Sequence, residues 1–326
     1  MKLNHIYKSI ACGVLLAMTA TSCDLDYNPV DTYSDVTEGV NKTDEKPIFN
    51  SVQDVETSMV TLHKKFRDQQ EHWYVDKLLI GDAHSDNAYA GTTGAEVVPY
   101  ETNSIEGSNS VLKRDWDRFL GDIAVANRII VGCDQLKALS ESERGKYQSQ
   151  AKIFRAMVMF DMVRLWGNFP VITTVGGDIT ADNVEEMYPT YFPPQNTAEE
   201  AYAQIEKDLT EAVENPNTPT NDTSDKSILT KSVARAMLAK VYAEKPLRDY
   251  AKVIKYADEL AADGFDLVED FSDLWAYDTE KKDCRVRNAK EAILEAHFPP
   301  GSGNWCTWMF GRNLSNWDES FTWAKW

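Results

Sequence analysis

Apolar residues recur at intervals of three and four along most of the chain after residue 50, which is the pattern of amphipathic α-helices. Ser51 precedes the first of these segments and can cap its N-terminus. Its expected buried face consists of Val55, Met59, Leu62 and Phe66. A second helix is predicted from the stripe Leu112, Trp116, Phe119, Ile123, Asn127 and Ile130.

A third helix is predicted from about Ser142 to Trp166, and it is apolar on nearly every side. Its apolar positions are Ile153, Phe154, Met157, Val158, Phe160, Val163 and Leu165. A helix with so little polar surface belongs in the middle of a packed helical array. Gly167 can adopt the left-handed conformation that ends a helix, and Pro170 prevents continuation.

The second half of the chain carries start signals for more helices. Thr197 and Glu200 form a capping box, and Thr230 and Asp249 can cap the next two helices. The last two are joined by a short turn, so we expect an antiparallel hairpin. The predicted fold is mostly α: tetratricopeptide-like helical hairpins with long loops and little β-structure. Strand-like runs are few, at residues 169–175 and 292–298.

The N-terminus has the layout of a secretory signal peptide, residues 1–22, with lysines flanking a short apolar run. Small residues then precede Cys23, which resembles a bacterial lipobox and predicts lipidation of this cysteine; the alternative is an ordinary signal with a chance cysteine. Residues 23–50 are polar and turn-rich and predict a tether. Residues 51–326 form the predicted domain.

The formal charge of −18 argues against nucleic-acid binding, because phosphate contacts need a basic surface. Outside the signal peptide and Cys23, three cysteines remain, with no spacing that indicates a disulfide framework. Common catalytic signatures are absent, including GxSxG, the P-loop and GxGxxG. The histidines show no zinc-ligand spacing, so we expect no catalytic residue, no metal and no cofactor.

The polar segment GDAHSDNAYAG, residues 81–91, is the best local candidate for a ligand site. Asp82, Asp86 and Asn87 carry hydrogen-bonding groups, and Tyr89 and Tyr100 lie near them in the sequence. The segment lacks the glycine and glutamate of a calcium loop. Two interpretations stay open: polar recognition of a ligand, or a turn whose Asp and Asn side chains cap its own backbone.

Residues 151–172, AKIFRAMVMFDMVRLWGNFPVI, closely resemble the signature helix of SusD/RagB-family outer-membrane lipoproteins. Further matches follow in the family's order: LDYNP at 25–29, GDxxSDN at 81–87, Trp116 with Ala126 and Asn127, YxxIxxDL at 202–209, SVARAMLAKVY at 232–242 and EAILE at 291–295. The resemblance covers residues 23–326.

This resemblance implies a SusD-like α superhelix on a lipid-anchored protein at the cell surface, attached to the outer membrane. It implies capture of nutrient oligosaccharides and their delivery to a SusC-like TonB-dependent transporter, without catalysis. Members of the family normally extend well past residue 326, so the C-terminal part of the domain is expected to be missing. The alternative functions are a peptide-binding member or a helical-repeat scaffold that binds protein; a surface glycosidase is the third.

The last stretch of the chain, GNWCTWMFGRNLSNWDESFTWAKW, holds five of the nine tryptophans. Exposed indole rings either bind something or pack against a further segment. We expect Trp305, Trp308 and Trp317 to contribute to a sugar-binding platform, because an indole ring can cover the apolar face of a pyranose. For Trp323 and Trp326 we expect core packing.

Overall fold

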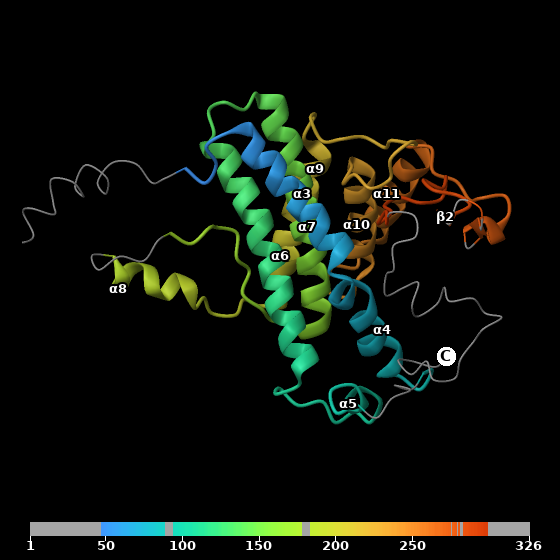
Figure 1. Cartoon of the computed structure of the whole chain (residues 1–326), viewed down its shortest axis with the longest axis horizontal. Coiled ribbons are helices and arrows are strands. Elements are labelled where there is room, and N and C mark those ends of the chain that lie inside the picture. The colour runs from blue at the N-terminus through green and yellow to red at the C-terminus, as the bar shows by residue number, and fades with distance from the viewer. Residues whose placement is uncertain are drawn as a thin grey trace, which may run out of the picture. The chain divides into compact units, whose positions relative to one another are not determined.

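The computed structural model describes residues 47–88, 94–177, 183–274, 276–278, 280 and 283–298. All of these except Pro47 belong to one packed unit, Ile48–Trp326. Its longer helices are α3 (Val52–Asp68), α6 (Ser110–Gln135), α7 (Glu141–Trp166), α9 (Ala198–Glu214), α10 (Lys231–Ala243) and α11 (Tyr250–Ala262), as Figure 1 shows. The prediction of a mostly α-helical fold is confirmed.

Short elements connect these helices. Between α3 and α6 lie the π-helical turns η1 (Glu71–Val75) and η2 (Leu79–Ala83), with α4 (Asp76–Leu78) between them and α5 (Val98–Glu101) after them. Between α7 and α9 lie α8 (Val184–Met187) and the 3-10 turn η3 (Tyr188–Tyr191). After α11 come the 3-10 turn η4 (Phe271–Leu274) and two short antiparallel strands, β1 (Tyr277–Asp278) and β2 (Asp283–Cys284). No described helix combines the length and the apolar character needed to cross a bilayer.

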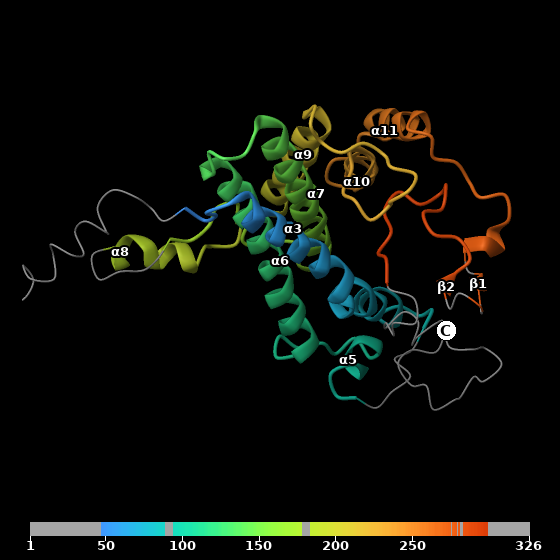
Figure 2. The ribbon, with the colours of Figure 1, turned by 45° about the horizontal axis from the view of Figure 1, so that its top comes forward.

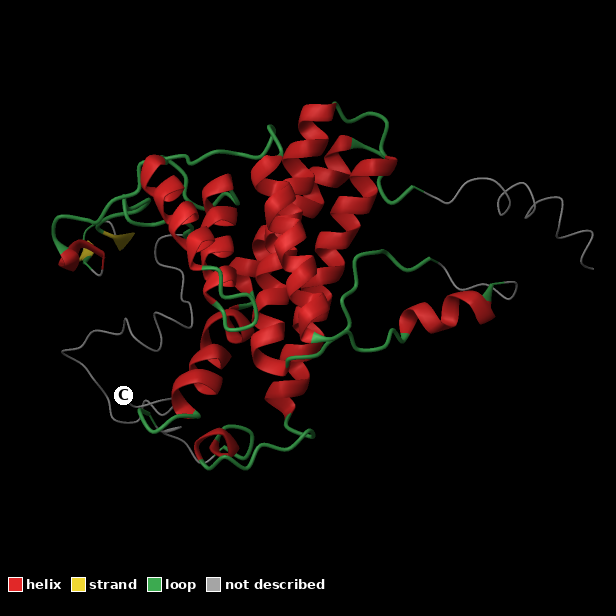
Figure 3. Cartoon of the chain, turned by 180° about the vertical axis from the view of Figure 1, so that it is seen from behind, coloured by secondary structure: helices red, strands yellow, loops and turns green. Residues whose placement is uncertain are grey.

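Neighbouring helices in the sequence pack against each other in series: α6 on α7, α7 on α9, α9 on α10, and α10 on α11 (Figures 1 and 3). Helix α7 also contacts α3 and α10, which places it in the middle of the array as its all-round apolar sequence predicted. In Figure 2, α10 and α11 lie beside each other as a hairpin.

The predicted helix ends are confirmed. Ser51 caps α3 in a reciprocal capping box with Asp54. Thr197 does the same with Glu200 at α9, and the Thr230 side chain accepts from Val233 N at α10. Helix α7 ends at Trp166, where Gly167 takes a φ of +73°, a conformation that costs a glycine little.

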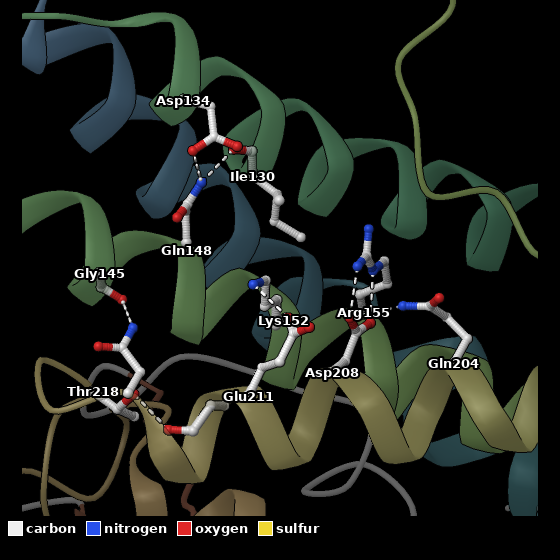
Figure 4. Close-up of polar contacts among 12 residues, drawn as sticks. Ile130, Asp134, Gly145, Gln148, Lys152, Arg155, Gln204, Asp208, Glu211 and Thr218 are labelled. Atoms are coloured by element: carbon white, nitrogen blue, oxygen red, sulfur yellow. Dashed lines mark hydrogen bonds and ion pairs between the residues drawn. The ribbon is translucent and has the colours of Figure 1, made fainter.

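A buried ion pair joins α7 to α9. The Arg155 guanidinium donates to both carboxylate oxygens of Asp208, at 2.8 and 2.7 Å, and Gln204 donates to the same carboxylate (Figure 4). Burial raises the pKa of Asp208, and the bonds from Arg155 oppose that shift. Each partner thus compensates the desolvation of the other.

The same arginine reaches a third helix. Arg155 donates to Asn127 Oδ1 of α6 at 2.7 Å, and the amide of Asn127 donates to the carbonyl oxygens of Ile172 and Thr174. Asn127 therefore fixes the direction of the chain after α7. Residues 169–175 were predicted as a strand, and that prediction is wrong, because Phe169 forms only an isolated bridge with Asn196. The side chain of Asn127 bonds to carbonyl groups that a neighbouring strand would otherwise have bound.

The second predicted strand, residues 292–298, is also not a strand. The Glu295 carboxylate accepts from the backbone N–H groups of Asn288 and Ala289, each at 2.9 Å, and Glu295 N donates to Lys226 O. The two bonds to the Glu295 carboxylate turn the segment back toward residues 288 and 289, and the bond to Lys226 O attaches it to the loop before α10. Its apolar run is used for packing against the helices and not for a sheet.

The packed fold begins slightly before the predicted domain boundary at residue 51. Phe49 is buried, and Ile48 N donates to Gln135 Oε1 at the end of α6. A Cβ at Gly132 would lie 2.4 Å from the Phe49 ring, so only glycine leaves room for this ring on α6. The last residues of the predicted tether, 48–50, therefore belong to the folded unit.

We expect Arg155→Ala to lower the free energy of unfolding by about 3–5 kcal/mol, because it leaves the Asp208 carboxylate buried without its partner. Urea unfolding followed by circular dichroism measures this change. Lys152→Ala is the matched control on the same helix: its pair with Glu211 is half-exposed and should contribute under about 1 kcal/mol. Equal losses for the two variants would contradict the assigned importance of the buried pair.

Candidate functional site

The predicted ligand-binding loop follows directly from η2. Ser85 organises its turn: the Ser85 hydroxyl donates to Asp82 O at 2.7 Å and accepts from Asn87 N at 3.2 Å. Asp86 and Asn87 are exposed and Asp82 is half-buried. The backbone of this turn is thus satisfied mainly by a serine, not by the Asp and Asn side chains that self-capping would use.

The side chains of Asp82, Asp86 and Asn87 stay available for other partners. Among the described residues, none of the three forms a side-chain hydrogen bond or an ion pair. The turn therefore carries two carboxylates and an amide within six residues, at the end of η2 and directly after it. Such groups can accept hydrogen bonds from hydroxyl-rich ligands.

Tyr100 has a different position from the one predicted. Its side chain is fully buried, packed with Leu79, Ala83, Val97 and Val111 in a small hydrophobic cluster below the loop. The ring of His84 meets it edge-on at 6.4 Å. Its hydroxyl donates to Asn109 Oδ1 over a long 3.5 Å. Tyr100 therefore supports the loop from beneath and offers no ring face to a ligand, which corrects the expected contact role.

Four of the predicted ligand-binding residues, Tyr89, Trp305, Trp308 and Trp317, lie outside the described residues, as does Cys23. The structure therefore neither brings them to the loop nor separates them from it. Within the described residues, no three His, Cys, Asp or Glu side chains converge as metal ligands.

Residues 71–76, which precede the loop, are attached to α6 by charged side chains at three positions along the helix. Arg118 pairs with Glu71, and Arg114 pairs with Asp76. Between them along the segment, Asp122 accepts from His72 Nε2 at 3.0 Å and from the Trp73 indole at 3.2 Å. These contacts hold residues 71–76 on α6 and so determine where the loop begins.

An aromatic cluster lies beneath this attachment. Phe119 contacts Trp73 and Trp166 edge-on, with ring centroids 5.8 and 5.9 Å apart. Trp116 contacts Trp166 in the same way at 5.4 Å. Trp116 therefore has a structural role, since edge-to-face pairs of this kind stabilise a core.

A second surface feature was not predicted from the sequence. Tyr188 and Phe192 are 56% and 67% exposed, and their rings contact each other with centroids 4.9 Å apart. The Tyr191 hydroxyl donates to Gly177 O, and Asn196 N donates to Phe169 O at the base. The sequence feature that could have indicated this surface is a group of three aromatic residues, Tyr188, Tyr191 and Phe192, which lie among prolines without helical spacing.

A sequence profile of the SusD-like family, described as starch-binding and associating with the outer membrane, matches residues 32–243. This match covers well over half of the chain. The chain belongs to the SusD-like family.

Relatives at the sequence level include a SusD-like protein of Bacteroides ovatus, which is 25% identical over 309 residues, 91% of this chain and 50% of its own length. Among solved structures, surface glycan-binding protein A from Bacteroides fluxus matches with a TM-score of 0.62 and 21% identity, over 78% of this chain and 52% of that protein. A laminarin-binding SusD-like protein matches with a TM-score of 0.58 and 20% identity, over 70% and 48%.

This SusD-like chain thus spans about half the length of the relatives that it matches. The structural matches confirm the fold. The family motif that carried the resemblance has a clear structural basis, because Arg155 and Asn127 form the buried network between α6, α7 and α9.

We expect Tyr100→Ala to destabilise the protein by about 3–5 kcal/mol, because it empties a buried aromatic position. Tyr100→Phe should change the free energy of unfolding by under about 1 kcal/mol, because the hydrogen bond lost is long. Denaturant titration of both variants measures these changes. Ligand affinity that drops in Tyr100→Phe at unchanged stability would restore the direct contact role.

Proposed function

We propose that this SusD-like chain captures nutrient oligosaccharides at the cell surface and delivers them to a SusC-like TonB-dependent transporter without catalysing a reaction. Family membership supports this proposal. The observation that carries it is the turn at residues 82–87, whose backbone is satisfied by Ser85, while its two carboxylates and its amide have no side-chain partner among the described residues.

Sugar recognition needs both polar acceptors and flat apolar surfaces. Carboxylates and amides bind hydroxyl groups, while aromatic rings cover the C–H face of a pyranose. In this proposal Asp82, Asp86 and Asn87 bind hydroxyl groups. Tyr89 and the tryptophans Trp305, Trp308 and Trp317 supply the ring faces.

The relatives support a glycan as the ligand class. A laminarin-binding protein is among the structural matches, and so is surface glycan-binding protein A from Bacteroides thetaiotaomicron in complex with laminarihexaose, with a TM-score of 0.56 and 16% identity over 69% of this chain and 46% of that one. For this chain we propose oligosaccharides as a class and name no particular glycan.

We expect Asp86→Ala and Asn87→Ala each to weaken oligosaccharide binding by about 10–100-fold, as the loss of a hydrogen bond in a binding site does. Isothermal titration calorimetry against a panel of oligosaccharides measures the affinities. Asp258→Ala, an exposed change on α11, is the matched control and should leave them unchanged.

Two outcomes would overturn this assignment. Binding of peptides but of no oligosaccharide would favour the peptide-binding alternative. Co-purification with a transporter, without affinity for any small ligand, would favour a protein-binding scaffold. Unchanged sugar affinity in Trp305→Ala and Trp308→Ala would remove the tryptophan platform from the proposal while leaving the polar turn.

We further propose that Cys23 carries the lipid that anchors the protein to the outer membrane. Cys23→Ala should abolish incorporation of labelled palmitate and move the protein out of the membrane fraction, since acyl chains supply the membrane affinity. Cys12→Ala is the control, because Cys12 lies within the predicted signal peptide. Labelling that persists in Cys23→Ala would contradict the lipid site.

A further inference from the structure

Two buried carboxyl groups face each other where the loop-bearing segment packs on α6. Asp76 of α4 is 3% exposed and Asp115 of α6 is 1% exposed. Asp76 Oδ2 accepts a hydrogen bond from the Arg114 guanidinium. Both oxygens of Asp115 are buried, and no donor group of the described residues bonds to either of them. This carboxyl group lacks the partner that buried charges normally have.

The arginine beside the pair does not supply that partner. Arg114 Nε lies 3.8 Å from Asp115 Oδ1, which is too far for a hydrogen bond, and Nε itself is buried without an acceptor. An ionised Asp115 would therefore be a second negative charge in a dry site beside Asp76. Two carboxylates in such a site do not both stay ionised.

A proton on Asp115 resolves both difficulties. It removes the unpaired charge, and it supplies the missing donor, because Asp76 lies within hydrogen-bonding reach of Asp115. The Asp115 hydroxyl then donates to the Asp76 carboxylate, whose charge stays paired with Arg114. The three side chains together carry no net charge in this arrangement.

The groups around the pair favour this arrangement. Burial is the largest cause that raises the pKa of Asp115, followed by Asp76, and together they bring it to about 8 against the smaller opposing effects of Arg114 and Arg118. Arg118 is itself paired with Glu71 of η1. Burial, followed by Asp115 and Asp76, also raises the pKa of Tyr100 on α5, which keeps that phenol neutral.

We propose that Asp115 keeps its proton at neutral pH and donates it in a hydrogen bond to Asp76, and that loss of this proton loosens the attachment of residues 76–88 to α6. The pair lies at the joint between α6 and the segment that carries the polar turn. The turn would thus be held firmly in neutral and acidic surroundings and less firmly in alkaline ones. This inference is independent of the ligand proposed above.

The pH dependence has a defined sign. An unfolded aspartate has a pKa of about 3.9, well below that of folded Asp115, so the folded state binds the proton more tightly. The contribution of Asp115 to the free energy of unfolding is therefore fully present below its unfolded pKa. It is lost as the pH rises toward the pKa of folded Asp115, which is about 8. The local loosening follows the folded-state titration and so occurs near that higher value.

The test uses Asp115→Asn, whose amide donates to Asp76 at every pH, with Asp117→Asn as the control. Asp117 is an exposed residue on the same helix and pairs with Lys113 one turn away. Thermal unfolding is measured from about pH 5 to about pH 9, which covers the range in which folded Asp115 still holds a proton that the unfolded chain has released. We expect a decline in stability for the wild type and the control, and a distinctly flatter profile for Asp115→Asn.

Hydrogen exchange locates the change. Amides of residues 76–88 should lose protection in the wild type between pH 7 and about pH 9, relative to amides of α7, and should keep it in Asp115→Asn. Identical pH profiles in the wild type and Asp115→Asn, in either measurement, would overturn the proposal.

Infrared spectroscopy tests the proton directly and does not depend on a variant that folds. The wild-type protein at pH 7 should show the carbonyl band of a protonated carboxylic acid that disappears near the pKa of Asp115. Absence of that band at pH 7 would overturn the proposal even if Asp115→Asn cannot be purified. Persistence of the same band in a folded Asp115→Asn variant would also overturn it.

Discussion

The bond between Arg155 and Asp208 is the constraint on which the rest of the structure depends. A guanidinium buried in the middle of a helical array has to find its acceptors there, so α6, α7 and α9 are held in the one arrangement that provides them. Through Asn127 the same network directs the chain that leaves α7. The hydrophobic cores of these helices allow many relative positions, whereas this set of bonds allows few.

The helices could be predicted from the sequence, because their signals are local. Capping residues such as Ser51 and Thr197 act within one turn, and the apolar period reports directly which face is buried. Residues 292–298 were predicted as a strand because an apolar run has the same composition whether it pairs or packs. Only the distant contact of Glu295 with the loop at Lys226 decides between the two.

The candidate site was predictable only in part, for a related reason. The polar turn could be identified because Asp82, Asp86 and Asn87 are neighbours in the sequence. The burial of Tyr100 depends on how its segment packs against others, which no local sequence pattern shows. The same holds for the contact of Asp76 with Asp115, because the two residues are about 40 positions apart in the sequence. The family resemblance rested on a segment that includes Arg155, but the role of this arginine follows from its buried partners, which only the structure shows.

The π-helical turns η1 and η2 have a consequence for how this region can vary. A π turn holds one more residue than an α turn, so each marks a position where the helix has absorbed a single extra residue. Removing that residue would restore regular α-helix and leave the residues after it pointing in nearly the same direction, because the wide turn has already taken up the extra residue. Keeping the residue in regular α-helix would instead rotate everything after it by about 100° around the helix axis. The π turns therefore let this segment change its length by one residue while residues 84–88 keep the direction in which they present their polar side chains.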